Sequence, residues 1–216
     1  MHGFGEKGTD NQKQLKGVGA AFTKKAIREK FPAFLVVPQS PGSWIPHPVF
    51  DKPIAMPAKP ATPLLLATEL VSSLEKKHPI DSNRLYLMGY SNGACAVWEL
   101  LERYPKTWAA AVPMAGAGEP RHVAAAAHVA IWAFHGKKDP TIPIHRMEEL
   151  MSALEAAQGH PLYTVIPNGV HYDAKGKGLA DPTVIPWMFA QKRGQPVVAF
   201  DSVAGPKAKR PTSLEK

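Results

Sequence analysis

The chain has 216 residues, of which 44% are hydrophobic and 20% charged, and this globular composition excludes a disordered, collagen-like or coiled-coil chain. The 26 basic and 18 acidic residues give a net charge of +8, but the basic residues are scattered rather than gathered in a stripe with aromatics, so nucleic-acid binding is not expected. The single cysteine, Cys95, excludes an intramolecular disulfide and a cysteine-rich zinc site.

Apolar runs along the chain are short, and none approaches the roughly 18–20 residues of a membrane-spanning helix. The first residues carry neither the basic nor the apolar part of a signal peptide, but they begin inside a loop-like motif. We therefore expect a soluble protein, and the sequence does not decide its cellular compartment. It is either cytoplasmic or secreted with a signal that lies ahead of this sequence.

Apolar periodicity and turn residues define the predicted elements. In chain order we predict a helix over 12–30, a strand over 34–37, a proline-rich loop over 39–63, a helix over 62–77, a strand over 84–89, a helix over 92–104, strands over 109–115 and 128–135, a helix over 144–158, a strand over 162–166, a helix over 184–192 and a weaker strand over 196–200. This alternation predicts an α/β fold with a mostly parallel central sheet and helices on both faces. We expect one domain over 1–194 and a basic, flexible tail over 195–216.

The segment Gly89-Tyr90-Ser91-Asn92-Gly93 lies where a predicted strand ends and a predicted helix begins. The pattern G-x-S-x-G at such a junction is typical of a nucleophile elbow. Its tight turn requires small residues two positions before and after the serine and exposes the serine hydroxyl. The first N–H groups of the helix point toward a developing oxyanion. The motif therefore predicts that Ser91 is a nucleophile.

A nucleophilic serine needs a base, and the base needs an acid that orients it. Asp139 and His171 each follow a predicted strand, so both lie at the sheet edge where such folds bind ligands. We predict Asp139 as the acid and His171 as the base. Asp173 is interpreted as a helper or surface residue, and His135 as a packed residue that binds backbone.

The glycines near the N-terminus allow two interpretations. Gly3, Gly5 and Gly8 match the dinucleotide pattern G-x-G-x-x-G, but no strand precedes them and the acidic residue about twenty positions on falls in a predicted helix. The alternative is an oxyanion loop, in which the backbone N–H groups of Phe4 and Asn92 bind the oxyanion. The elbow downstream favours the oxyanion loop.

Three segments carry a family resemblance. His-Gly-Phe-Gly-Glu-Lys-Gly-Thr-Asp-Asn at 2–11, Pro-Gln-Ser-Pro at 38–41 with Trp44 after it, and Gly-Tyr-Ser-Asn-Gly at 89–93 together resemble the bacterial phospholipase/carboxylesterase branch of the α/β-hydrolases. This branch lies near polyhydroxybutyrate-depolymerase-like and feruloyl-esterase-like enzymes. The similarity runs from residue 1 to about 194. One departure is Lys175, which stands where such enzymes often carry a tryptophan.

The resemblance implies an α/β-hydrolase catalytic domain over 1–194 that hydrolyses esters without a metal or cofactor. It implies Ser91, Asp139 and His171 as catalytic residues and the N–H groups of Phe4 and Asn92 as oxyanion donors. We expect a serine carboxylesterase that acts on short to medium acyl or aryl esters, small-molecule substrates, through an acyl-enzyme on Ser91. An acyltransferase on the same scaffold and a truncated, non-catalytic hydrolase-like module remain alternatives.

Two aromatic residues are candidates for substrate binding. Tyr90 lies inside the elbow, and Trp44 lies in the proline-rich loop. Trp44 could line an acyl or aromatic pocket, or it could only pin the loop onto the core. The natural ester and its acyl length stay open.

The family fold places a strand ahead of the His-Gly loop, between the predicted strands 34–37 and 84–89, and this sequence shows none. Strands lie about 4.8 Å apart, so the sheet would be N-terminally incomplete, with a gap lined by unpaired backbone groups. Each such buried group costs about 1–3 kcal/mol. We expect one of three outcomes. In the first, the chain is a fragment of a longer protein. In the second, the gap is filled by residues 196–200 or, through self-association, by a partner chain. In the third, the sheet closes up without that strand.

Overall fold

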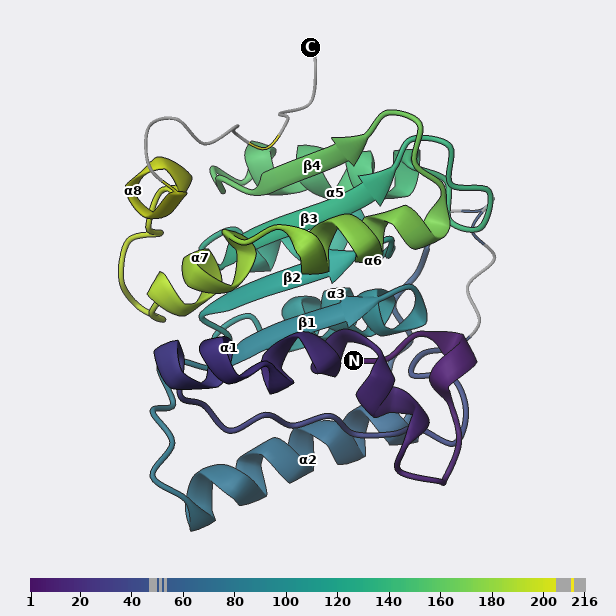
Figure 1. Ribbon diagram of the computed structural model, residues 1–216. Coiled ribbons are helices and arrows are strands. Elements are labelled where there is room, and N and C mark those ends of the chain that lie inside the picture. The colour runs from purple at the N-terminus through teal and green to yellow at the C-terminus, as the bar shows by residue number, and fades with distance from the viewer. Residues whose placement is uncertain (47–49, 51, 53, 205–210, 212–216) are drawn as a thin grey trace.

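Figure 1 shows the computed structural model, which describes residues 1–46, 50, 52, 54–204 and 211. Its centre is a parallel sheet with the strand order β1-β2-β3-β4. The strands are β1 (Tyr86–Tyr90), β2 (Ala110–Met114), β3 (Ala130–Gly136) and β4 (Leu162–Ile166). All residues of β2 and β3 are buried, as expected for a sheet covered on both faces. The predicted α/β fold is confirmed.

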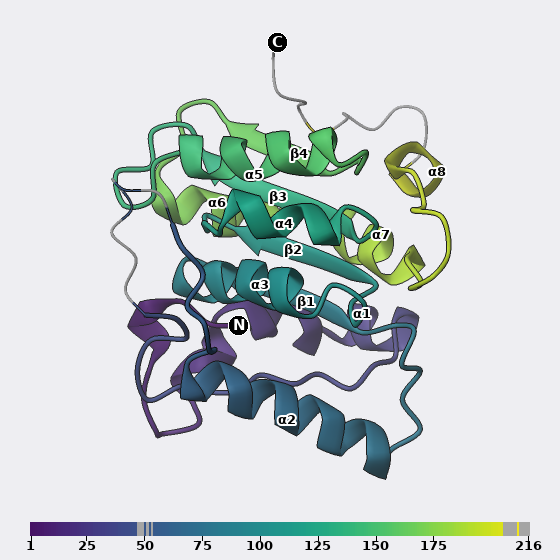
Figure 2. The same cartoon turned by 180° about the vertical axis from the view of Figure 1, so that it is seen from behind.

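Helices form a layer on each side of the sheet. The near face in Figure 1 carries α1 (Lys25–Lys30), α6 (His171–Ala180) and α7 (Val184–Ala190). Figure 2 shows α2 (Thr62–Lys77), α3 (Asn92–Arg103), α4 (Pro120–Val123) and α5 (His145–Ala156) on the opposite side. Trp98 and Leu101 of α3 belong to one core cluster, and Trp132 and Phe134 of β3 to the other. The sheet therefore separates two apolar cores.

Most predicted elements are found within two residues of their predicted bounds. The helix over 62–77 and the strand over 162–166 have the bounds that the sequence predicted. These elements have clear apolar periodicity and end at Pro, Gly or polar turns, and such local signals are sufficient to place them.

The predicted helix over 12–30 is wrong as a single element. The segment forms 3-10 turns at Lys13–Lys16 and Val18–Thr23, followed by the short helix α1. Gly17 interrupts it with a backbone conformation that is neither helical nor extended (φ −88°, ψ −132°). Glycine is about 1 kcal/mol less favourable than alanine inside a helix, so little helix stability is lost when the chain leaves the helical conformation at this residue.

Helix α6 was not predicted. It begins at His171 and includes Gly176 and Gly178, which hide its helical pattern. A Cβ at Gly178 would lie 2.7 Å from Sδ of Met114, so this glycine lets the helix approach β2 closely. Packing against the sheet stabilises a helix that propensity alone does not favour.

The predicted strand over 34–37 is also wrong. Residues 32–38 run in an extended path beside β1 (Figure 1), but among the described residues no backbone hydrogen bond joins them to the sheet. Phe34 and Leu35 are 56% and 46% exposed. A cavity of about 1290 Å³ lies between this segment and the β1 edge. The segment is not a strand because no neighbouring strand pairs with it.

The sheet has therefore not closed up around the gap, which we call the β1 slot and define as the cavity between 32–38 and β1. Met1 lies at its β1 side: its amino group donates to the Met88 carbonyl oxygen at 2.6 Å, and the Tyr90 N–H donates to the Met1 carbonyl oxygen at 3.4 Å. These two contacts follow the pattern of a parallel ladder. Filling of the slot by a partner chain stays a prediction.

Residues 196–200 neither form a strand nor fill the β1 slot, contrary to prediction. Residues 196–199 have no regular structure, and Phe200 begins the short helix α8 (Phe200–Ala204). The Phe200 ring packs edge-on against Trp132 at 5.3 Å, and this contact holds the segment on the near-face core. Apolar side chains here serve helix packing rather than pairing.

The domain boundary near 194 stays a prediction. Half of the expected flexible tail, residues 205–210 and 212–216, lies outside the described residues, as does part of the proline-rich loop. In the part of the chain that is described, no helix combines the length and apolar character needed to span a bilayer.

Candidate active site

Ser91 occupies the sharp turn between β1 and α3. Its backbone has φ 55° and ψ −123°, a conformation that non-glycine residues rarely adopt. A Cβ at Gly89 would collide with the Gly93 carbonyl, and a Cβ at Gly93 would collide with the carbonyl oxygens of Met1 and His2. The turn therefore has the geometry expected of an elbow, with both small residues required by close backbone contacts.

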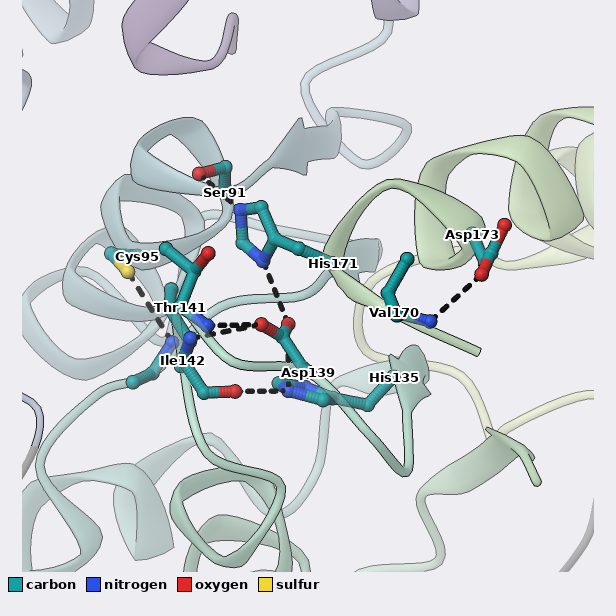
Figure 3. Close-up of polar contacts among 10 residues, drawn as sticks. Ser91, Cys95, His135, Asp139, Thr141, Ile142, Val170, His171 and Asp173 are labelled. Atoms are coloured by element: carbon teal, nitrogen blue, oxygen red, sulfur yellow. Dashed lines mark hydrogen bonds and ion pairs between the residues drawn. The ribbon is translucent and has the colours of Figure 1, made fainter. Parts of the chain in front are cut away.

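Ser91, His171 and Asp139 form a continuous chain of hydrogen bonds (Figure 3). Nε2 of His171 lies 2.8 Å from Oγ of Ser91, and Nδ1 lies 2.7 Å from Oδ2 of Asp139. The three residues come from the start of α3, the start of α6 and the loop after β3. All three lie at the carboxyl ends of parallel strands, where the sequence order predicted them to meet.

The Asp139 side chain is fully buried and its oxygens are all hydrogen-bonded. Oδ1 accepts the N–H groups of Thr141 and Ile142 at 2.8 and 3.0 Å, and Oδ2 faces His171 and, at 3.4 Å, Nε2 of His135. Burial alone would raise the pKa of Asp139, but hydrogen bonds from His135, His171 and Ile142 outweigh it and hold the pKa below its usual range. Asp139 is therefore an ionised acceptor for the imidazole.

The two alternatives that the sequence offered have other partners. Oδ2 of Asp173 accepts the Val170 N–H at 2.7 Å, and in Figure 3 this carboxylate points away from His171. Nε2 of His135 lies 2.8 Å from the Ile142 carbonyl oxygen, so this buried ring holds the loop that carries Asp139. The geometry favours Asp139 as the partner of His171.

The loop of residues 2–6, which we call the oxyanion loop, lies against the elbow. His2 fixes it: Nε2 accepts the Ser40 N–H at 2.9 Å, and Nδ1 lies 2.8 Å from the Gly3 carbonyl oxygen. Phe4 begins a 3-10 turn, Phe4–Glu6. Asn92 is the first residue of α3, where an N–H has no carbonyl partner within the helix. Both predicted oxyanion donors thus belong to segments that meet at Ser91.

Trp44 is buried rather than open to a substrate. It is 1% exposed, and its Nε1 donates to the His2 carbonyl oxygen at 3.1 Å. Its backbone N–H donates to Oδ1 of Asn92 at 2.8 Å, and Nδ2 of Asn92 donates to Ser43. Of the two roles weighed from the sequence, the structure favours the one in which Trp44 pins the loop. The Asn92 side chain adds a contact that sequence reasoning missed.

Tyr90 lies beside the imidazole. Its ring centroid is 5.2 Å from that of His171 and 6.3 Å from that of Tyr172. Burial, with Asp139 nearby as a lesser cause, raises the pKa of Tyr90 to about 12, so its hydroxyl stays protonated at neutral pH. The position next to His171 keeps Tyr90 a candidate for substrate contact.

The sequence matches the phospholipase/carboxylesterase family over residues 1–175. The chain belongs to this family. A search of curated proteins gave no match. Family membership points to a hydrolase that acts on esters.

Solved structures agree with the phospholipase/carboxylesterase assignment. A thermostable esterase is 29% identical with a TM-score of 0.79, over 89% of this chain and 53% of its own, so this chain spans about half the length of that protein. The SOBER1 protein of Arabidopsis thaliana and esterase PE8 are 18% and 19% identical, with TM-scores of 0.57 and 0.54. They cover 79% and 83% of this chain and 88% and 87% of their own chains. At that identity they show the α/β-hydrolase fold alone.

In this phospholipase/carboxylesterase member, Cys95 is a packing residue. Its thiol is buried and lies 3.3 Å from the Ala117 N–H, and burial raises the pKa of Cys95 to about 12. Among the described residues no group of three His, Cys, Asp or Glu side chains is arranged to hold a metal ion. Ser91, His171 and Asp139 supply the chain of hydrogen-bonded side chains at the elbow.

Proposed function

We propose that this chain is a serine carboxylesterase that cleaves small-molecule esters through an acyl-enzyme on Ser91. The observation that carries the proposal is the hydrogen-bonded chain from Ser91 through His171 to Asp139 at a strand-to-helix elbow. Serine, imidazole and buried carboxylate in this order are the constellation used for acyl transfer on several unrelated folds.

The geometry supports the following mechanism. Ionised Asp139 accepts a hydrogen bond from Nδ1–H of His171, and this fixes the tautomer in which Nε2 is free to take the Ser91 hydroxyl proton. Oγ then attacks the ester carbonyl, and the N–H groups of Phe4 and Asn92 stabilise the oxyanion. His171 returns the proton to the departing alcohol. Water attacks the acyl-enzyme by the same route and releases the acid and free Ser91.

We expect short to medium acyl or aryl esters to be the preferred substrates. Each buried CH₂ of the acyl chain contributes about 0.8 kcal/mol until its pocket ends. Tyr90 lies beside His171 and offers an apolar ring surface for a group of limited size. Hydrolysis rates across a panel of p-nitrophenyl esters should therefore rise to about eight carbons and then fall.

Labelling with a serine-directed fluorophosphonate tests the mechanism. The wild-type chain should be labelled and Ser91→Ala should not, and the variant should lose about 10⁶-fold in kcat. Circular dichroism of the variant should match the wild type. Unlabelled wild-type protein would favour a non-catalytic module, and ester products formed with an added alcohol would favour an acyltransferase.

A further inference from the structure

The oxyanion loop and the helix that carries His171 are joined by side chains outside the hydrogen-bonded chain of the site. Glu6 lies at the end of the 3-10 turn that begins with Phe4, and Lys175 lies one turn after His171 in α6. Nζ of Lys175 is 3.8 Å from Oε1 of Glu6. This ion pair bridges two segments that are about 170 residues apart in sequence.

Glu6 holds the oxyanion loop through its other carboxylate oxygen. Oε2 accepts the Gly3 N–H at 2.9 Å, while the Glu6 N–H donates to the Gly3 carbonyl oxygen at 3.0 Å. These two bonds close the turn on both sides of Phe4. The carboxylate also packs against Gly17, where a Cβ would lie 2.5 Å from Oε1. The position of the Phe4 N–H therefore depends on where the Glu6 carboxylate sits.

Lys175 is held equally firmly at the helix end of the pair. Its ammonium lies 4.8 Å from the Tyr90 ring and 4.7 Å from the Tyr172 ring, within the range of cation–π attraction. The side chains of Lys175 and Glu6 are only 14% and 20% exposed, so solvent and salt screen their attraction less than that of a surface pair.

We propose that Glu6 and Lys175 are positioning residues that fix the oxyanion donor of Phe4 relative to the His171 base. Neither side chain touches the reacting atoms. The pair acts on the transition state because a donor aimed at the oxyanion and a base aimed at Ser91 must be correctly placed at the same time. This inference rests on the proposed ester hydrolysis.

Lys175→Met tests the pair, since it keeps the unbranched shape and most of the length of the side chain and removes its charge. On a p-nitrophenyl ester we expect kcat to fall about tenfold, below the roughly 10²-fold cost of a misplacement by 1 Å, with KM changed less than about twofold because the loss arises in the transition state. Lys175→Arg keeps the charge and should recover most of the activity.

Glu6→Gln isolates the ion pair from the loop contact, because its amide oxygen can still accept the Gly3 N–H. It should lose as much kcat as Lys175→Met, and the double variant should be no worse than either single one. Multiplied effects in the double variant would overturn the proposal. So would a kcat of Lys175→Met within about twofold of the wild type, which is below the tenfold expected for a misplaced donor.

Lys177→Met is the matched control. Lys177 lies in the same helix, is exposed and has no ion pair among the described residues, so its loss should leave kcat unchanged. Fluorophosphonate titration of active sites normalises every rate to folded, reactive protein. Unlabelled wild-type protein would overturn the proposed function itself, whereas labelled wild-type protein with unaffected pair variants would overturn the pair alone.

Discussion

Residues of the same type have different roles in this protein because their surroundings differ, and Asp139 and Asp173 are the clearest example. Both carboxylates lie near His171 in the chain or in space. Asp139 is enclosed, faces the imidazole and receives backbone N–H groups, whereas Asp173 caps the first turn of α6. The sequence distinguished them by strand position alone, and the structure supplies the physical difference.

Asp139→Asn should therefore cripple turnover, and Asp173→Asn should not. An amide at 139 favours the wrong imidazole tautomer, and the equivalent change in a well-studied serine protease costs about 10⁴-fold in kcat. Asp173→Asn retains an oxygen for the Val170 N–H and should cost less than about 0.5 kcal/mol of stability. Steady-state kinetics of both variants decide. A larger loss for Asp173→Asn would show that the wrong carboxylate was chosen.

Helix α3 shows how an element can carry charged groups into a core. It presents Ser91 at its start and buries Glu99 and Glu102 further along. Oε1 of Glu102 accepts the Glu119 N–H at 2.8 Å, and Glu99 is paired with Arg103. Burial, with smaller repulsion from Glu99 and Glu119, raises the pKa of Glu102 to about 8. The folded state therefore binds a proton there that the unfolded chain releases.

Glu102→Gln should stabilise the protein at alkaline pH. The folded pKa lies above the unfolded value of about 4.5, so the wild type loses stability as pH rises from about 4.5 to 8 and the loss is complete above that. Glutamine keeps the acceptor for Glu119 without a charge. Urea unfolding should show a gain from the substitution that is at least about 1 kcal/mol larger at pH 8.5 than at pH 5. A difference that is the same at both pH values would contradict this protonation.

The elements also show where local signals fail. Helix α6 contains two glycines, and its stability comes from packing on β2 and β3, which no window of sequence reveals. Conversely, residues 34–37 are as apolar as a buried strand but have no strand to pair with. Local propensity favours a strand or helix, but the element forms only where a neighbouring element packs or pairs with it.

At the scale of the whole molecule, the β1 slot is the main departure from a closed sheet. The Met88 carbonyl and the Tyr90 N–H bind Met1 on the slot side of β1. Backbone groups of every second residue point to the same side of a strand, so the N–H groups of Tyr86 and Met88 also face the slot. The other edge of β1 is fully paired with β2. Protection of the sheet should therefore be uneven across β1.

Hydrogen exchange can measure this unevenness. The amides of Tyr86 and Met88 should exchange at least about tenfold faster than those of Ala111 and Val112, which lie in the central strand β2. Measurement at low and high protein concentration tests self-association, which would protect the slot as concentration rises. If the amides of β1 and β2 are equally protected at every protein concentration, the slot is closed within one chain.

The sequence by itself determined the residues that carry the proposed chemistry and their order at the strand ends. An elbow, an apolar strand and a turn are encoded over a few neighbouring residues, so Ser91, Asp139 and His171 could be found without coordinates. Only the tertiary structure decided that Trp44 is buried against His2, that Glu6 meets Lys175 and that residues 34–37 leave the sheet. Those outcomes depend on which distant segments come into contact, and contacts between distant segments are set by packing rather than by local pattern.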